Sequence, residues 1–397
     1  MQAIDLTRLA AGEAIPEETP AVLEARRAME VCNACRYCEG YCAVFPAMEL
    51  RREFTGGDLN YLANLCHSCR GCYYACQYAP PHEFGINVPR VLAEVRSESY
   101  AQYAWPGPLA ALYRRNGLVM SLAMAAGVGG VLLLAMLLQR HAVLFGPQPV
   151  VPGAGFYNVV PYGVMVGVAS VTFLFSILAL GIGFARFWRD TGGRAAELAQ
   201  GRPLLQALRD AATLRYLGGG GHGCNDTDAS FSTQRRWFHH LMAYGFLLCF
   251  ASTSTATVYD HLLGWAAPYR FWSLPVLLGT VGGAGLIAGT AGLFWMKLAG
   301  DQEPQARNLL GADAGLLLLL LMIGVTGELL LAVRATGAMG TVLAVHLGFV
   351  LAFFVTMPYS KFVHGIYRTG ALIRHAIERP GASDPKPHVV AAATPAR

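Results

Sequence analysis

Residues 32–42 read CNACRYCEGYC and residues 66–76 read CHSCRGCYYAC, so eight of the ten cysteines lie in two copies of one pattern. In each copy three cysteines are separated by two residues, and a fourth follows after three more. Such gaps let one turn bind several irons of a cubane cluster, and in paired runs the fourth cysteine ligates the neighbouring cluster. The pattern therefore predicts two [4Fe–4S] clusters. Their expected ligands are Cys32, Cys35, Cys38 and Cys76 for one cluster and Cys66, Cys69, Cys72 and Cys42 for the other.

Structural zinc and a disulfide scaffold are the two alternatives for this cysteine set. Zinc sites usually pair two Cys-x2-Cys knuckles across a longer gap, whereas here four cysteines run together. Disulfides need an oxidising compartment, and nothing in the sequence places these residues outside the cell. The pattern therefore favours iron–sulfur clusters and indicates a protein that moves electrons.

The composition indicates that most of the chain lies in a membrane. Of the 397 residues 54% are hydrophobic and only 14% are charged, which is too apolar for an ordinary soluble protein. The N-terminus is polar and has no apolar segment behind a basic start, so we expect no signal peptide. The cysteine-rich part is then expected in the reducing cytoplasm. The modest net charge of +5 does not indicate a nucleic-acid partner.

Six stretches approach the roughly 20 apolar residues needed to cross a bilayer. They are residues 117–138, 162–185, 237–258, 273–296, 314–333 and 341–362. One set of connections is rich in cations, namely Arg114, Arg115, Arg186, Arg189, Arg194, Arg202, Arg209, Arg215, Arg235, Arg236, Lys297, Arg307, Lys361, Arg368 and Arg374. The other set carries little beyond Arg140, Arg270 and Arg334. The positive-inside rule predicts a protein of the inner (cytoplasmic) membrane with both termini and the cysteine runs in the cytoplasm.

Histidines in or beside these spans are candidate haem ligands, because a polar ring in hydrocarbon is costly and usually functional. His239 and His240 lie at the cytoplasmic mouth of the third span, and His364 lies at the cytoplasmic end of the sixth. Opposed imidazoles on two helices can hold b-type haem. We expect His364 to pair with His239 or His240. Adjacent residues on a helix point about 100° apart, and the sequence does not choose between them.

A second, outer haem is the further expectation for His261 and His346. His346 lies eighteen residues before His364, which is five helical turns, so on one unbroken helix both would face the same way at about 27 Å separation. His261 lies near the outer end of the third span and could match His346 in depth. The alternative for each histidine is an interfacial ring that hydrogen-bonds at headgroup level.

Two glycine-rich stretches need separate explanations. The fourth span carries glycines at helical spacing, which indicates close helix packing, with a groove for a porphyrin as the alternative. The loop 187–236 contains GGGGHGC at residues 218–224. No strand precedes this run, so dinucleotide binding is excluded, and we expect the segment to pack against the cysteine-rich domain. His222 and Cys224 are candidate ligands there, or bystanders in a turn.

Three runs resemble the tricarballylate/citrate-utilisation protein B family: CNACRYCEGYCAVFP, CHSCRGCYYACQYAPPHEFGINVP and RRWFHHLMAYGFLLCFASTSTATVYDH. The resemblance covers nearly the whole chain. It implies a membrane electron carrier with two [4Fe–4S] clusters and b haem. Such a carrier would reoxidise the flavin of a separate FAD-dependent dehydrogenase that acts on tricarballylate or a related tricarboxylate. The first domain is also similar to the helical ferredoxin domains of fumarate- and succinate-oxidising complexes.

The expected fold is mainly α. Residues 1–104 should form a helical ferredoxin-like domain, residues 105–378 a six-helix transmembrane bundle with the cytoplasmic loop 187–236, and residues 379–397 a flexible tail. The expected function is electron transfer from the flavoprotein through clusters and haem to membrane quinone, with Lys361 or Tyr359 as candidate quinone contacts. A membrane-bound redox or iron sensor with labile clusters is the alternative. No catalytic constellation for a substrate is present, so substrate oxidation is expected on the partner.

Overall fold

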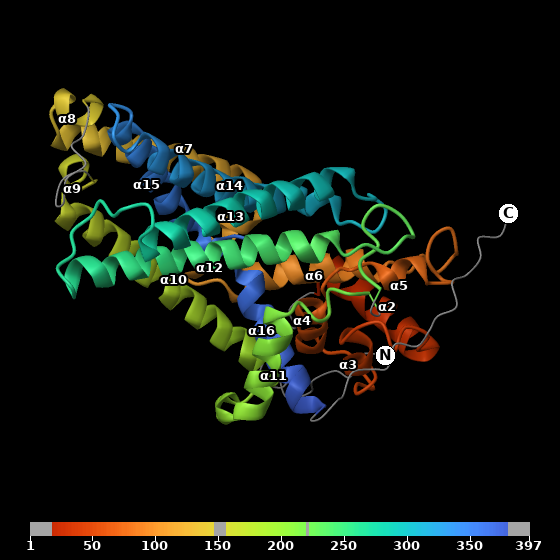
Figure 1. Cartoon of the computed structure of the whole chain (residues 1–397). Coiled ribbons are helices and arrows are strands. Elements are labelled where there is room, and N and C mark those ends of the chain that lie inside the picture. The colour runs from red at the N-terminus through yellow and green to blue at the C-terminus, as the bar shows by residue number, and fades with distance from the viewer. Residues whose placement is uncertain (1–17, 147–155, 220–221, 380–397) are drawn as a thin grey trace.

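The computed structural model describes residues 18–146, 156–219 and 222–379, and these segments are built from helices. The extended pairing within them is a single bridge between Cys224 and Ser232. Figure 1 shows the N-terminal helices gathered at one end of a long bundle, with the short helices α8 (His141–Phe145) and α9 (Phe156–Val159) at the other end. The mainly helical fold predicted from the sequence is confirmed. The predicted C-terminal tail lies outside the described residues apart from Arg379.

Five helices form the N-terminal domain around an apolar core. They are α2 (Pro20–Cys35), α3 (Val44–Met48), α4 (Gly56–Leu65), α5 (Gly71–Tyr74) and α6 (Val88–Tyr103). Helix α4 begins with a capping box, in which Thr55 and Asp58 satisfy each other's backbone N–H groups. Phe45, Leu59 and Leu62 are fully or almost fully buried between the helices. Helices α3 and α4 lie between the two cysteine runs, in agreement with the helical N-terminal domain expected from the sequence.

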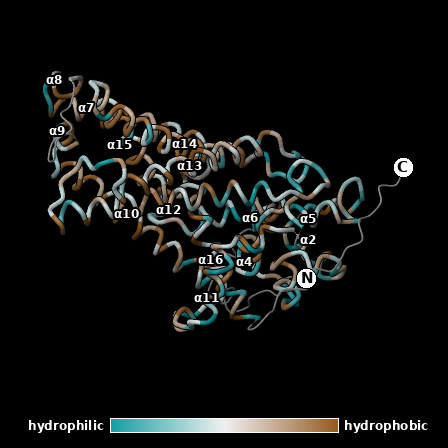
Figure 2. The backbone as a smooth tube through the Cα atoms, viewed as in Figure 1, coloured by the Kyte–Doolittle hydropathy of each residue, from teal (hydrophilic) through white to brown (hydrophobic). Residues whose placement is uncertain are grey.

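In the part of the chain that the structure describes, six helices are long and apolar enough to cross a membrane, as predicted. They are α7 (Asn116–Leu138), α10 (Tyr162–Asp190), α12 (Gln234–His261), α13 (Leu274–Ala299), α14 (Leu310–Val333) and α15 (Met339–Thr356). Figure 2 shows apolar residues along the length of this bundle and hydrophilic residues concentrated around the N-terminal domain. The loop that follows α10 is itself partly helical, since it contains α11 (Gly201–Ala212).

The end of the sixth span differs from the prediction. Helix α15 ends at Thr356, a 3₁₀ turn occupies Met357–Tyr359, and a new helix, α16 (Val363–Glu378), follows. Pro358 lies in this turn and has no N–H group to continue the helical hydrogen bonding. His364 therefore lies on α16 and not at the end of the sixth span. The expectation that His346 and His364 share one face of an unbroken helix is wrong.

Glycines bring α12 and α13 into close contact, which confirms the packing explanation for the glycines of the fourth span. A Cβ atom on Gly289 would lie 2.3 Å from the backbone nitrogen of Met242, and one on Gly245 would lie 2.5 Å from that of Leu286. A different face of α13 meets α14, where Gly283 makes room for the side chain of Glu328. Atoms of neighbouring helices fill the space beside these glycines, which therefore do not form a groove for a porphyrin.

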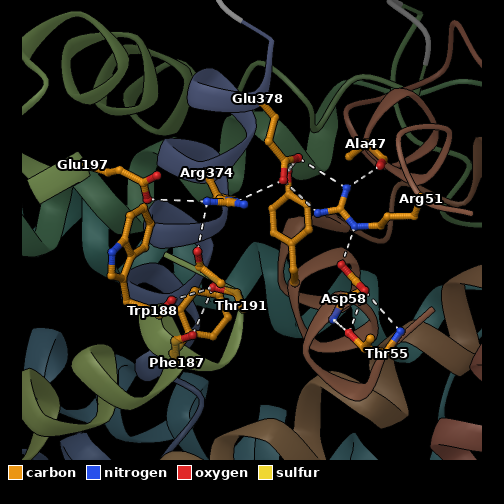
Figure 3. Close-up of polar contacts among 12 residues, drawn as sticks. Ala47, Arg51, Thr55, Asp58, Phe187, Trp188, Thr191, Glu197, Arg374 and Glu378 are labelled. Atoms are coloured by element: carbon orange, nitrogen blue, oxygen red, sulfur yellow. Dashed lines mark hydrogen bonds and ion pairs between the residues drawn. The ribbon is translucent and has the colours of Figure 1, made fainter. Parts of the chain in front are cut away.

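A network of ion pairs fastens the N-terminal domain to α16 and to the segment after α10 (Figure 3). Arg51 binds Asp58 at 2.7 Å and Glu378 at 2.9 Å, and its side chain is only 10% exposed. Arg374 donates a hydrogen bond from Nε to Glu378 at 3.0 Å and also approaches Glu197 at 3.5 Å. Glu378 is thus shared by two guanidinium groups from different parts of the fold.

Replacing Glu378 with alanine is expected to destabilise the junction, because Arg51 and Arg374 then lose their common partner. Loss of a charged hydrogen-bonding partner at a mostly buried position costs about 2 kcal/mol. Thermal unfolding of the purified protein in detergent should show a midpoint lowered by several degrees. Glu94→Ala is the control, because Glu94 forms an exposed ion pair with Arg90 whose loss is worth about 1 kcal/mol at most. Equal effects of the two substitutions would contradict this role of Glu378.

Candidate functional site

Each cysteine run turns at the residue that follows its second cysteine. Arg36 follows Cys35 with a φ of 55°, and Arg70 follows Cys69 with a φ of 67°, so both adopt the left-handed conformation. Arg36 ends α2 by donating its N–H to the carbonyl oxygen of Cys32 at 2.8 Å. The backbone of each run therefore reverses at the same position in the pattern, with two cysteines before the turn and the third after it. A loop of this form can surround a cluster from several sides.

The first predicted ligand set surrounds a cavity of about 240 Å³. Its walls contain Cys32, Cys35, Cys38 and Cys76, together with Cys72 of the other set and apolar or aromatic side chains. Tyr37 lines the same cavity and is 59% exposed, so this part of the domain is open to a partner. The structure thus brings together all four cysteines of the first set.

Thiols of each cysteine run affect the pKa of thiols in the other run, so the two runs lie close together. Burial raises the pKa of Cys32 to about 12. Among the neighbouring thiols, Cys76 of the second run raises this pKa the most. Burial also raises the pKa of Cys42, and there the largest thiol contribution comes from Cys69 of the second run. The fourth cysteine of each run therefore lies with the other run. This arrangement supports the crosswise ligand sets.

The chemistry of the donor set fits iron–sulfur clusters. All ten cysteines are described and free, so each run offers four thiols. A cubane cluster is held by four cysteine thiolates, one on each of its irons. Among the described residues, no group of three or more His, Cys, Asp or Glu side chains is arranged to hold a single metal ion.

Three guanidinium groups converge on the backbone of the second run. Arg96 of α6 donates to the carbonyl oxygen of Cys66 at 2.6 Å, and Arg368 of α16 donates to the same oxygen at 2.9 Å. Arg235 of α12 donates to the carbonyl oxygen of Ser68 at 2.6 Å. The second cysteine run is therefore held by two helices of the membrane domain as well as by its own domain.

His239 and His364 face each other next to these arginines. Their ring centroids are 6.1 Å apart and their planes are inclined by 80°. Two imidazoles on opposite sides of one iron, with metal–nitrogen bonds of about 2 Å, have centroids about 6 Å apart. Nδ1 of His364 lies 2.5 Å from the carbonyl oxygen of Lys361, so donation of its N–H to that oxygen leaves Nε2 free to bind a metal. Nδ1 of His239 is buried and has no hydrogen-bond partner among the described residues. These features fit a pair of haem ligands.

Comparisons with known proteins identify the family of the chain. Residues 109–384 match the family model "Citrate utilization protein B", and residues 25–102 match "Citrate utilization protein B Fer4-like domain". Over 361 residues the chain is 50% identical to Citrate utilization protein B of Escherichia coli, which covers 90% of this chain and 92% of that protein. The chain belongs to the citrate utilization protein B family. No solved structure matches the chain.

In this member of the citrate utilization protein B family, His240 points away from the pair formed by His239 and His364. Its ring packs against Tyr244 at 5.7 Å, and the hydroxyl of Tyr244 donates to the carbonyl oxygen of Ala212 at the end of α11. The structure thus places His239, and not its neighbour, opposite His364. The sequence alone left both histidines open.

The two histidines of the predicted outer haem have separate partners. His261 lies at the end of α12, where its ring packs against Tyr162 at 5.4 Å and Asp260 is 3.8 Å away. His346 on α15 is within hydrogen-bond distance of the Thr326 hydroxyl on α14, at 3.0 Å. Each ring is engaged by a different helix, so the structure supplies no paired site for a second haem here.

The remaining candidates also have protein partners. Lys361 and Lys297 both bind Asp313, the first at 2.5 Å, and the Tyr359 hydroxyl donates to the carbonyl oxygen of Trp105 at 2.8 Å. The polar groups of Lys361 and Tyr359, which were expected to contact quinone, are thus bound to other parts of the protein. Neither residue is assigned as a quinone contact. His222 packs against Phe231 at 5.4 Å.

The arginines at the second run were missed as site residues by sequence reasoning, although their spacing offered a signal. Arg235 precedes His239 by four residues, and Arg368 follows His364 by four. Residues four apart lie on the same face of a helix. On both helices an arginine therefore lies one turn from the histidine and reaches the cysteine run.

Proposed function

We propose that this protein transfers electrons from a partner FAD-dependent dehydrogenase through two [4Fe–4S] clusters and b haem to membrane quinone. The observation that carries the proposal is the contact of the second cysteine run with α12 and α16. Arg235 and Arg368 bind its backbone, and one turn away on the same helices lie His239 and His364. A redox centre bound by the second run would thus lie beside one bound by the histidines.

The bound clusters and haem supply one-electron redox centres, while the chain sets their order and surroundings. Cys32, Cys35 and Cys38 lie near the exposed Tyr37, so the first set is the side accessible to a partner. The second set lies against the membrane domain through Arg235 and Arg368, and Arg96 holds it from its own domain. The cations also stabilise additional negative charge on a neighbouring centre, which favours its reduced form. Electrons entering at the first set therefore have a continuous route to the histidine pair.

The proposed location is the inner membrane, with the cysteine runs in the cytoplasm. The bias of Arg and Lys toward the end of the bundle that carries the N-terminal domain supports this orientation. The partner flavoprotein would then oxidise its substrate in the cytoplasm. Tricarballylate or a related tricarboxylate is the proposed substrate class, in keeping with the name of the Escherichia coli relative. This chain would regenerate the partner's oxidised FAD.

The decisive experiment combines the purified, cluster-loaded protein with a candidate partner dehydrogenase, its tricarboxylate substrate and a soluble quinone analogue. Substrate should reduce the haem here, visible by absorbance, and quinone should reoxidise it with consumption of two electrons per quinone. Reduction of the partner's flavin without reduction of the haem would contradict electron transfer. In that case cluster loss that changes the activity of a membrane partner would favour a redox or iron sensor.

Replacing Arg368 with glutamine is expected to slow reduction of the haem by dithionite-reduced clusters by roughly tenfold, the equivalent of about 1.4 kcal/mol in the barrier. The reason is loss of a cation and of the hydrogen bond that ties α16 to Cys66. Stopped-flow absorbance measures the rate. Arg202→Gln removes an exposed arginine of α11 and serves as the control. A wild-type rate in Arg368→Gln would remove this arginine from the proposed route.

A further inference from the structure

The two ends of the glycine run at residues 218–223 lie against Cys69. We call residues 217–219 and 222–226 the Cys69 cover. The N–H of Asn225 donates to the carbonyl oxygen of Cys69 at 2.9 Å. Leu217 and Cys224, which are 4% and 1% exposed, pack with Cys69 in one buried group. Arg70, the next residue, donates to the carbonyl oxygen of Asp226 at 2.6 Å. The prediction that this segment packs against the cysteine-rich domain is confirmed.

Two glycines of the cover are required by its backbone. Gly219 has a φ of 45°, and a Cβ atom there would lie 2.1 Å from the carbonyl oxygen of Gly223. Gly223 has a φ of 127°, and a Cβ atom would lie 2.5 Å from the carbonyl oxygen of Ser232. Cys224 and Ser232 exchange two backbone hydrogen bonds of 2.8 Å, which fix the far side of the cover. Both glycines adopt the left-handed side of φ space, where other residues are strained.

The side chains of the cover close the protein around Cys69. Cys69 is itself only 7% exposed, and it belongs to the buried group that includes Leu217 and Cys224. The thiol of Cys224 is directed toward the carbonyl oxygen of Leu217 at 3.8 Å. The cover therefore contributes buried apolar packing at this edge of the second cysteine run.

We propose that the Cys69 cover shields the second [4Fe–4S] cluster, with Leu217 and Cys224 keeping water from the edge formed by Cys69. The proposal rests on the proposed function, since it requires a cluster on Cys42, Cys66, Cys69 and Cys72. The hydrophobic shell around a metal site controls the access of solvent to it. The same packing limits access of chelators to the iron. The Cys69 cover is then part of the redox site and not a nucleotide-binding loop.

The test compares Gly219→Ala with Gly218→Ala in the anaerobic, cluster-loaded protein. Gly218 is the matched control, because its added Cβ atom would meet only the carbonyl oxygen of Arg215, at an ordinary 3.5 Å. During incubation with a ferrous chelator, EPR should show the second-cluster signal of Gly219→Ala decaying about tenfold faster than in the wild type, because the added Cβ atom clashes with the carbonyl oxygen of Gly223 and displaces the cover. Gly218→Ala should match the wild type.

Leu217→Ala is a second test that remains informative if Gly219→Ala does not assemble. It opens space beside Cys69 without changing the backbone, so iron loss should accelerate. Decay in Gly219→Ala that matches that of Gly218→Ala would overturn the proposal, as would wild-type iron loss in Leu217→Ala or a change confined to the first cluster. A wild-type protein with only one cluster would contradict the proposed function itself, and this inference with it.

Discussion

Replacing Cys69 with serine is expected to remove one complete cluster, so that the iron content falls from about eight to about four atoms per chain. Cys69 is buried, and among the neighbouring thiols it raises the pKa of Cys42 in the other run the most. A cubane cluster that loses one of four thiolates in a buried site loses both a bond and its charge balance. Iron and sulfide analysis with EPR of the reduced protein measures the effect. Cys249→Ser, which changes a thiol in α12 outside both runs, should keep the full iron content.

The crosswise arrangement makes a sharper prediction for the fourth cysteine of each run. Cys42→Ser should abolish the same EPR signal as Cys69→Ser, and Cys76→Ser should abolish the same signal as Cys35→Ser. If the ligands were instead grouped run by run, Cys42→Ser would behave like Cys35→Ser. Finding zinc in place of iron and sulfide in the wild-type protein would rule out clusters of either arrangement.

Replacing His364 with alanine is expected to abolish haem binding. The substitution replaces an imidazole ligand with a methyl group, which leaves the opposing ring of His239, 6.1 Å away, without its partner on the iron. A pyridine haemochrome assay should detect little or no haem in His364→Ala and in His239→Ala. Retention of iron–sulfur signals would show that each variant is folded.

His240→Ala is the matched control, because His240 is adjacent in sequence but packs against Tyr244. It should retain its haem, and loss of haem from His240→Ala but not from His239→Ala would show that the wrong ring has been assigned. His346→Ala tests the second haem expected from the sequence. A fall in haem content by about half in that variant would restore the two-haem prediction, whereas full content agrees with the contact of His346 with Thr326.

Much of the fold follows from local sequence features. The six spans were predicted to within a few residues at most ends, because hydrophobic length is a property of each segment alone. The end of the sixth span was not, because the prediction extended the helix through Met357–Tyr359, where the chain turns at Pro358. A local signal was present there, but the apolar run on either side of it concealed the break.

The candidate site divides in the same way. The eight cysteines were predicted as ligands from their spacing alone, since the chemistry of a cubane cluster favours short gaps between its ligands. The choice of His239 over His240 required the structure, because it depends on the rotation of α12 relative to α16 and not on either helix alone. The roles of Arg96, Arg235 and Arg368 also required it, since each reaches across from a different helix to the backbone of the second run.

The sequence by itself determined the kind of protein: a cysteine-rich domain for iron–sulfur clusters joined to six membrane helices. Both features are written in short-range spacing and in uninterrupted hydrophobic length. Only the tertiary structure decided which histidines face each other, where α16 begins, and that the Cys69 cover packs against Cys69. These depend on contacts between residues far apart in the chain, such as Asn225 with Cys69 and His239 with His364. No local period or spacing encodes such contacts, because they arise from how the helices pack together.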